Sequence, residues 1–176
     1  MASTDNCVDY DVRFAKEFGK FLGLKKKKIK TLMKFAKKGL IQRERLVELA
    51  ISDVSGIKMD STHGRDHEDG SDTKTVVSVM RNNQAALGRW TNSFTIRNVK
   101  TKTGALRIVA YNKFLDDFHY FFIPKSAYGN DVNQVEIVIE QVNGCYSDPN
   151  FNGVPSKHRK WWEYEVRSFE EMCKLR

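Results

Sequence analysis

Two carboxylates and a lysine near the middle of this chain have the types and spacing of a phosphodiester-cleaving site. Asp60 precedes a turn rich in glycine, acidic residues and histidine, and Asp72-Thr73-Lys74 opens the apolar run that follows. Hydrolysis of a phosphodiester needs charge neutralisation and an activated water, and hard cations such as Mg²⁺ prefer carboxylate oxygens. The period of two in a strand places Asp72 and Lys74 on one face. We therefore expect Asp60 and Asp72 to hold Mg²⁺ or Mn²⁺, with Lys74 assisting.

Other acidic residues compete for the same role. Asp66 and Asp69, inside the turn, are alternatives to Asp60 as the partner of Asp72, so the sequence leaves that partner open. Glu48, or Glu44, on the helix before the turn can supply a further carboxylate.

The turn itself has a simpler interpretation as a mobile surface connection. Against it, Asp72 and Lys74 enter a strand that otherwise reads as core, where charged groups are costly without partners. His63 and His67 are four residues apart, but the glycines around them disfavour a metal-chelating helix. We expect these histidines to be solvated or to contact phosphate.

The order Asp60, eleven intervening residues, then Asp72-Thr73-Lys74 resembles the PD-(D/E)xK signature of restriction-endonuclease-like nucleases. The resemblance covers residues 42–125. It implies that Asp60 and Asp72 are metal ligands, that Lys74 is the catalytic lysine and that Glu48 is an accessory carboxylate. Met59 stands where that family often has proline.

Charge points to a polyanionic partner. The chain carries a formal net charge of +8, and no acidic residue occurs between positions 18 and 43. Lysines crowd the segment 25–38, where a structural helix would normally interleave glutamates. A phosphate backbone would offset their repulsion, although a solubilising face or a membrane-surface helix is also compatible with the pattern. The predicted nucleic-acid contacts are Lys26, Lys27, Lys30, Lys34, Arg81, Asn83, Arg97, Lys100 and Lys102.

The elements that must position these residues fall into two groups. Apolar residues at helical spacing predict helices over 14–22, 25–38 and 42–52. Alternation and β-branched runs then predict strands, one of them a short strand over 57–59 that ends at Asp60. Further strands are expected over 73–79, 94–99, 106–111, 119–123 and 135–139, with 94–99 and 106–111 paired as a hairpin.

The remainder of the chain is expected to be a loop over 143–155 and a last helix from Trp161 or Glu163 to Leu175. Arg81-Asn82-Asn83-Gln84 is expected to be a groove-contacting loop. The fold class is α+β or mixed α/β, with N-terminal helices followed by a mixed sheet of about four or five strands flanked by helices, in a restriction-endonuclease-like core.

The 176 residues fit one domain, with a helical basic part at 1–55, a sheet with the catalytic core at 56–140 and a loop and helix at 141–176. Three scattered cysteines suggest a reducing compartment, and no signal peptide or membrane-length apolar stretch is evident, so a cytoplasmic location without a membrane partner is expected. Phosphate-loop, dinucleotide and serine-elbow motifs are lacking.

Together these patterns predict a Mg²⁺- or Mn²⁺-dependent endonuclease of restriction, homing or phage type that acts on double-stranded DNA. Cutting both strands would need two sites, so a homodimer is expected. The alternative is a non-catalytic basic protein that binds nucleic acid.

Overall fold

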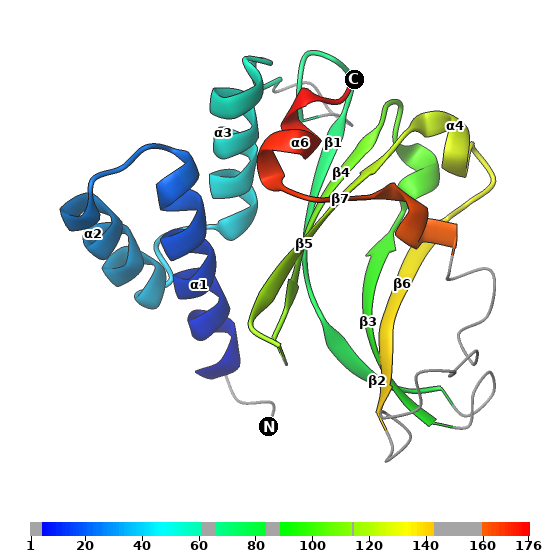
Figure 1. Ribbon diagram of the computed structural model, residues 1–176, viewed down its shortest axis with the longest axis horizontal. Helices are drawn as coiled ribbons and strands as arrows, with labels where there is room; N and C mark the ends of the chain where they lie inside the picture. The colour runs from blue at the N-terminus through cyan, green and yellow to red at the C-terminus, as the bar shows by residue number, and fades with distance from the viewer. Residues whose placement is uncertain (1–4, 61–65, 84–88, 114, 143–159) are drawn as a thin grey trace.

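Three layers build the molecule: helices, a four-stranded sheet and a three-stranded sheet. The computed structural model describes residues 5–60, 66–83, 89–113, 115–142 and 160–176. Figure 1 shows the N-terminal helices on one side of the four-stranded sheet and the smaller sheet on the other. The predicted class, helices first and then a mixed sheet flanked by helices, is confirmed.

The N-terminal helices are α1 (Asp5–Phe21), α2 (Lys26–Lys37) and α3 (Arg43–Ser55). Phe14, Phe18 and Ala36 are fully buried, because apolar residues at helical spacing form one stripe on each helix. Gly56 ends α3 in the left-handed conformation, at φ 72°, which glycine adopts without a Cβ penalty. The chain leaves α3 at this glycine and continues into the acidic turn.

The four-stranded sheet has the order β1-β4-β5-β7. β1 lies parallel to β4, whereas β4 with β5 and β5 with β7 are antiparallel. The bounds are β1 (Asp72–Val77), β4 (Leu106–Asn112), β5 (Asp117–Ile123) and β7 (Glu165–Val166). The parallel pair sets the N-terminal ends of β1 and β4 side by side, in register from Asp72 opposite Leu106.

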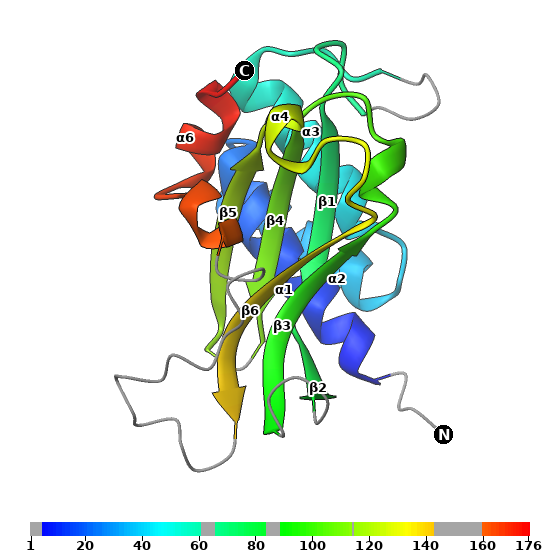
Figure 2. The same ribbon diagram turned by 90° about the vertical axis from the view of Figure 1, so that its right-hand side faces the viewer.

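The second sheet has the antiparallel order β2-β3-β6, from β2 (Val79–Asn83), β3 (Arg89–Arg97) and β6 (Gln134–Val142). β1 and β2 are separated only by Ser78, which is buried and binds the Tyr111 carbonyl and the Lys113 amide. One run of chain thereby passes from the first sheet to the second, as Figure 2 shows from the side. Arg81 to Asn83 lie in β2, so the expected groove-contacting loop there is a strand.

Two apolar cores fill the spaces between the layers. Val109 and Phe122 face the helices, with Phe14, Phe18 and Phe169. Ile108 and Phe121, next to them on the same strands, face the second sheet. The side chains of β4 and β5 therefore alternate between two buried faces, which explains why these strands read as continuous apolar runs.

One predicted pairing and one predicted strand are wrong. The segments 94–99 and 106–111 do not form a hairpin, because η1 (Val99–Thr101) and the turn after it carry the chain from one sheet to the other. Residues 57–59 form no strand in the described structure; they contribute a single bridge, from Met59 to His67.

The expected last helix is divided. A 3₁₀ turn, η2 (Lys160–Tyr164), comes first, then β7, then the short helix α6 (Phe169–Lys174). Pairing of Val166 with Tyr120 on β5 extends the backbone, and the Ser168 hydroxyl caps α6 by accepting from the Glu171 amide. A four-residue helix, α4 (Lys125–Tyr128), follows Pro124. The expected loop over 143–155 lies outside the described residues. In the described part, no helix is long and apolar enough to cross a membrane.

Candidate active site at the amino-terminal end of β1

Asp72 is the centre of a charged cluster at the start of β1. Only 1% of the residue is exposed. Its amide donates to the Ala105 carbonyl at 2.9 Å, the contact that begins the parallel pair with β4. The Lys74 ammonium forms an ion pair with Asp72 Oδ2, and Lys102 Nζ donates to Asp72 Oδ1 at 2.9 Å. The predicted juxtaposition of Asp72 and Lys74 is present, with Lys102 as an additional partner.

Lys102 comes from the turn after η1 and was expected to contact nucleic acid. Its carbonyl accepts from Lys125 Nζ at 2.7 Å, which ties the turn to α4. Burial alone lowers the pKa of the Lys102 ammonium, but the hydrogen bond and charge of Asp72 outweigh burial and raise it. The cation is therefore held on Asp72 at neutral pH.

Asp66 lies beside this pair. Its Oδ2 accepts from the Thr73 amide at 2.6 Å, and its carbonyl accepts from the Asp60 amide at 2.9 Å. Asp60 is thus next to Asp66 through the backbone, at the end of a bridge and not of a strand. The Asp66 carboxylate thus contacts the backbone of the Asp72-Thr73-Lys74 segment.

Glu48 reaches the cluster from α3. Arg45 Nη1 donates to its Oε2 at 2.9 Å. Burial raises the pKa of the Glu48 carboxyl; the Arg45 hydrogen bond opposes that shift and the nearby Asp66 charge adds to it. Lys74 also acts on the Glu48 pKa, in the lowering direction. Glu44 is half exposed and pairs with Arg43, so Glu48 is the acid of α3 that faces the site.

The middle of the turn is held by a network of hydrogen bonds around the buried Arg107. Arg107, fully buried on β4, donates to Asp69 Oδ2 at 3.0 Å and to the Leu175 carbonyl at 2.8 Å, and also bonds the Ser71 hydroxyl. Burial raises the pKa of Asp69, but hydrogen bonds from Ser71 and Arg107 outweigh it and lower the pKa overall. Asp69 is engaged by Arg107 and Ser71, whereas Asp66 lies beside Thr73.

His67 is buried and not solvated, contrary to the expectation for this residue. Its Nε2 lies 2.9 Å from Thr73 Oγ1. Burial lowers the pKa of His67, and the charge of Arg107 lowers it further. A neutral ring in this place packs the turn onto β1. His63 lies outside the described residues.

Backbone contact fixes the two turns against each other. A Cβ on Gly104 would lie 2.2 Å from the Gly70 carbonyl oxygen, so only glycine fits there. The turn that carries Lys102 and the turn that carries Asp66 and Asp69 therefore touch without an intervening side chain. This contact positions Lys102 over the start of β1.

No protein family, curated protein or solved structure matches this chain. The site is accordingly interpreted from its own geometry.

Sequence reasoning missed Lys102 and Arg107 as parts of the cluster. Arg107 did leave a signal: it is the one charged residue in the run Leu106 to Tyr111, and a charge in such a run needs a buried partner. The sequence around Lys102 gives no such signal, because a lysine in a turn before glycine is normally solvated.

Basic residues away from the cluster are differently placed. Lys26, Lys27, Lys30 and Lys34 are exposed on α2, and the structure gives them no ion pair with any described residue. Arg97 and Lys100 are exposed near the turn of Lys102. The side chains of Arg81 and Asn83 lie outside those described. Figure 1 places α2 at the outer edge of the helical layer, away from the start of β1.

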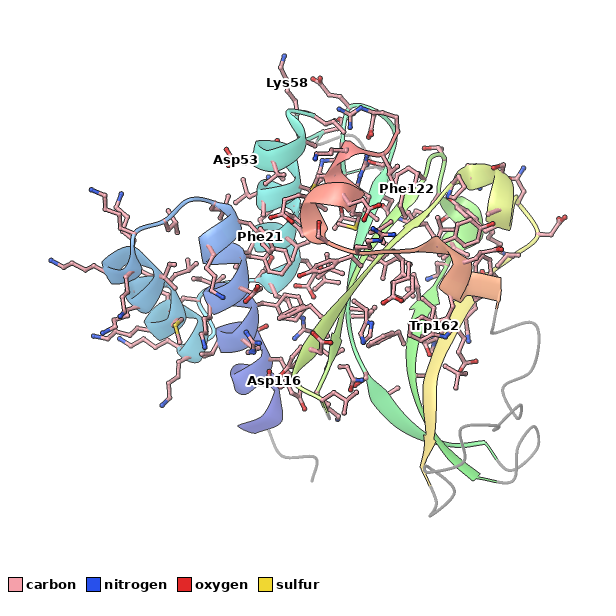
Figure 3. The ribbon with its side chains drawn as sticks, in the orientation of Figure 1. Phe21, Asp53, Lys58, Asp116, Phe122 and Trp162 are labelled. Carbon is pink, nitrogen blue, oxygen red and sulfur yellow. The ribbon has the colours of Figure 1, made fainter. Side chains whose placement is uncertain are left out.

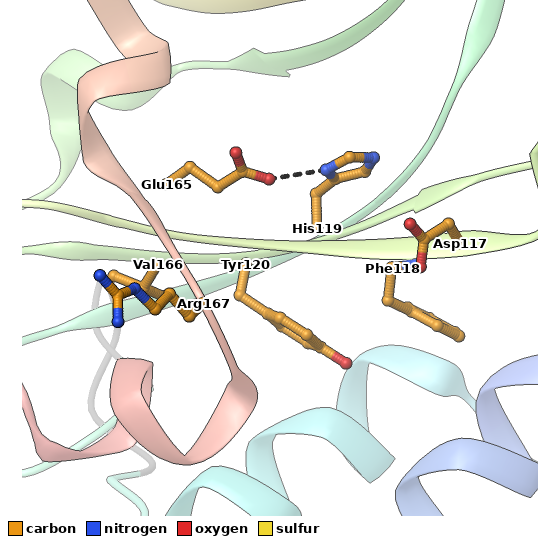
Figure 4. Close-up of a pocket in the computed structure, with 7 residues that line it drawn as sticks. All are labelled: Asp117, Phe118, His119, Tyr120, Glu165, Val166 and Arg167. Carbon is orange, nitrogen blue, oxygen red and sulfur yellow. Dashed lines mark hydrogen bonds and ion pairs between the residues drawn. The ribbon is translucent and has the colours of Figure 1, made fainter.

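A hollow along β5 and β7 is separate from the acidic cluster. Figure 4 shows its lining, with His119 and Glu165 on one side of β5 and Phe118 and Tyr120 on the side of the helices. His119 Nδ1 lies 2.7 Å from Glu165 Oε1. This contact joins the two strands and brings no further group to Asp72.

Proposed function

We propose that this chain is a divalent-cation-dependent nuclease acting on double-stranded DNA, with Asp72 and Lys74 at its centre. One observation carries the proposal: a buried carboxylate at the start of β1 contacts the lysine two residues on. Asp66 lies close enough to Glu48 to raise the pKa of the Glu48 carboxyl. The PD-(D/E)xK resemblance implies Asp60 as the first acid. Asp66, whose carboxylate accepts from the Thr73 amide, is the alternative first acid.

Carboxylate oxygens are the ligands that a hard cation prefers. In the buried Asp72 carboxylate both oxygens already contact an ammonium group, Oδ2 that of Lys74 and Oδ1 that of Lys102. Asp72, Asp66 or Asp60, and Glu48 are the residues that would hold Mg²⁺ or Mn²⁺. Among the described residues, no three acidic or imidazole groups are already gathered as ligands. Cation binding therefore requires the lysines to give up part of their hold on Asp72.

Bound there, the cation would polarise the phosphate and lower the pKa of water. The chain's own groups have distinct tasks. Lys74, fixed on the same face of β1 as Asp72, stabilises negative charge that develops on the attacked phosphate. Thr73 holds Asp66 in place through its amide. Burial around Asp72 excludes bulk water and strengthens each of these interactions.

Lysines of α2 supply the attraction for DNA. They carry no acidic partner in the described part, so their mutual repulsion is relieved when a phosphate backbone displaces counterions. DNA affinity would then fall steeply with salt. Two copies would be needed to cut both strands, which sedimentation of the whole chain tests directly.

Cleavage of supercoiled plasmid tests the proposal. With Mg²⁺ or Mn²⁺ we expect nicking or linearisation, abolished by EDTA and reduced at least about 100-fold in Asp72→Asn and Lys74→Met. Asp53→Asn is the matched control. Asp53 is an exposed acid on α3, and Figure 3 shows it pointing away from the cluster. Equal activity in Asp72→Asn and in the wild type would contradict the assignment.

The second candidate is a non-catalytic nucleic-acid-binding protein. It is favoured by the two lysines on Asp72, which already neutralise the carboxylate without a metal. Binding of DNA that is unchanged by EDTA, with no cleavage at any cation concentration, would support it over the nuclease.

A further inference from the structure

β1 is an edge strand of the four-stranded sheet, and Figure 2 shows β4 on one side of it. The amides of Asp72 and Ser78 donate to carbonyls of β4 and of the residue just before it. Because the backbone groups of successive strand residues point to opposite edges, the even-numbered residues of β1 face β4 and the odd-numbered ones face the open edge. In the described part of the chain, the N–H and C=O groups of Thr75 and Val77 have no hydrogen-bond partner on that edge.

A hollow of about 360 Å³ runs along this open edge. Five consecutive residues, Thr75 to Val79, line it. Since neighbouring side chains of a strand point to opposite faces, a lining of consecutive residues means that the hollow borders the edge of β1 and not one face of the sheet. Its other sides are formed by residues of α1, α3, β3 and the turn after β4, namely Tyr10, Arg43, Thr95 and Lys113.

Polar side-chain atoms beside the hollow are unpartnered. The hydroxyls of Thr75 and Thr95 are buried and make no hydrogen bond with any described residue, which is costly unless a ligand or water reaches them. Thr73, further up the same edge, differs: its amide donates to the Asp66 carboxylate at 2.6 Å. The edge is therefore closed by a carboxylate at its beginning and open from Thr75 onward.

The charged side chains that line the hollow are cationic. Of the described lining residues, Arg43 and Lys113 carry charge and none is acidic. Arg43 forms ion pairs with Asp11 at 3.2 Å and with Glu44 at 3.3 Å. The Lys113 ammonium lies 5.8 Å from the centre of the Tyr10 ring. An acidic side chain that entered the hollow would be attracted by both cations.

We propose that the open edge of β1 binds an extended, acidic peptide of a partner protein as an added strand. The main chain of the peptide bonds the N–H and C=O groups of Thr75 and Val77, and an acidic side chain of the peptide lies near Lys113. An extended chain fits because unpaired backbone groups at every second residue match the spacing of another strand. A second copy of this chain does not fit in this way, because its own β1 edge is flanked by α3 and β3 as well. This binding requires neither a metal ion nor DNA.

Binding of displayed peptides to the full chain tests the proposal. The probe is a library of peptides of about eight residues in which one position is fixed as glutamate and the others are randomised. We expect enrichment of peptides rich in strand-forming residues. Thr75→Pro removes the N–H that faces the open edge, and an edge strand accepts proline where its N–H is unpaired. It should weaken the enriched peptides at least about tenfold, whereas the matched control Thr75→Val, which keeps the N–H, should stay within about threefold of the wild type.

Charge reversal at Lys113 gives a second readout. Lys113→Glu should weaken the same peptides at least about tenfold at low salt and less at high salt, because an acid would then face their glutamate. Lys58→Glu is the control and should stay within about twofold of the wild type. Lys58 is exposed in the turn after α3, and Figure 3 shows it pointing out from the molecule. Equal affinity of Lys113→Glu and the wild type would overturn the acidic partner.

Amide hydrogen exchange of the wild-type chain shows where an enriched peptide binds. Exchange of the Thr75 and Val77 amides should slow at least about tenfold when the peptide is added, whereas that of Val76, which faces β4, should not change. This measurement needs no variant, so it decides even if Thr75→Pro fails to fold. The proposal is overturned if no peptide is enriched, if a bound peptide leaves the Thr75 and Val77 amides unchanged, or if Thr75→Pro folds and binds as tightly as the wild type.

Discussion

Arg107 Nη2 lies 3.0 Å from Asp69 Oδ2, and this contact joins the acidic turn to the buried face of β4. The arginine is fully buried and its cation lies 5.3 Å from the ring centre of Phe122. Phe122 shares an apolar core with Phe169 of α6, and Figure 3 labels it next to that helix. The turn that flanks the candidate site is therefore fastened to the core.

Removing the charge of Asp69 should destabilise the fold. Asp69→Asn leaves the buried Arg107 charge without its counter-ion, and we expect a loss of about 2–4 kcal/mol in urea unfolding. The lowered pKa of Asp69 means that its contribution is present above the ordinary value of 3.8 and is lost as the pH falls through the folded value. Glu68→Gln, an exposed neighbour, is the control and should change stability by less than about 0.5 kcal/mol. Equal effects of the two substitutions would contradict the network.

His67 should make the protein sensitive to mild acid. Its folded pKa is below the ordinary 6.5, so below pH 6.5 the unfolded chain binds more protons than the folded one. Stability then falls as the pH falls from about 7 to the folded pKa, and levels off below it. Urea midpoints measured from pH 8 to pH 5 should decline more in the wild type than in His67→Gln. Parallel declines in both proteins would rule this out.

Glu48→Gln should separate stability from activity. The raised pKa of Glu48 means that its ionised form is disfavoured in the folded state, and the penalty grows as the pH rises from the ordinary 4.5 to the folded value. The amide removes this penalty, so we expect a stability change at pH 7 within about 1 kcal/mol of zero or in the stabilising direction. Plasmid cleavage should fall at the same time. Asp53→Asn on the same helix should alter neither measurement, and a large destabilisation by Glu48→Gln would contradict the assignment.

Gly104→Ala should cost far more stability than alanine at Gly19, a buried glycine of α1. The new methyl group would meet the Gly70 carbonyl oxygen, which belongs to a backbone held by several bonds. We expect a loss of about 2–3 kcal/mol. At Gly19, within α1, the nearest atom is a flexible Ile29 side chain at 3.1 Å, so alanine there should be neutral within about 1 kcal/mol. Thermal melts of the two variants make the comparison.

Hydrophobic periodicity predicted a helix or strand well where the residue pattern on that segment alone identified it. The stripe on α2 and its glycine stop at Gly39, with φ 69°, follow directly from residue types. Strand 119–123 and its stop at Pro124 were equally clear, because alternating aromatics fill both cores.

Pairing between distant segments was not predictable in the same way. Nothing local distinguishes a hairpin of 94–99 with 106–111 from the parallel pair of β1 with β4, because both leave the same side chains buried. Prediction of the charged cluster around Asp72 from sequence has the same limit. Asp72 with Lys74 followed from strand period, whereas Lys102 reaches Asp72 only through the contact of two turns.

Ser78 gives the fold a mechanical consequence. It interrupts one run of chain that serves both sheets, and its own bonds go to Tyr111 and Lys113 at the far end of β4. If either sheet lost its strand from this segment, the strand in the other sheet would be disturbed as well. The two sheets should therefore melt as one cooperative unit, with a calorimetric enthalpy equal to the van't Hoff enthalpy.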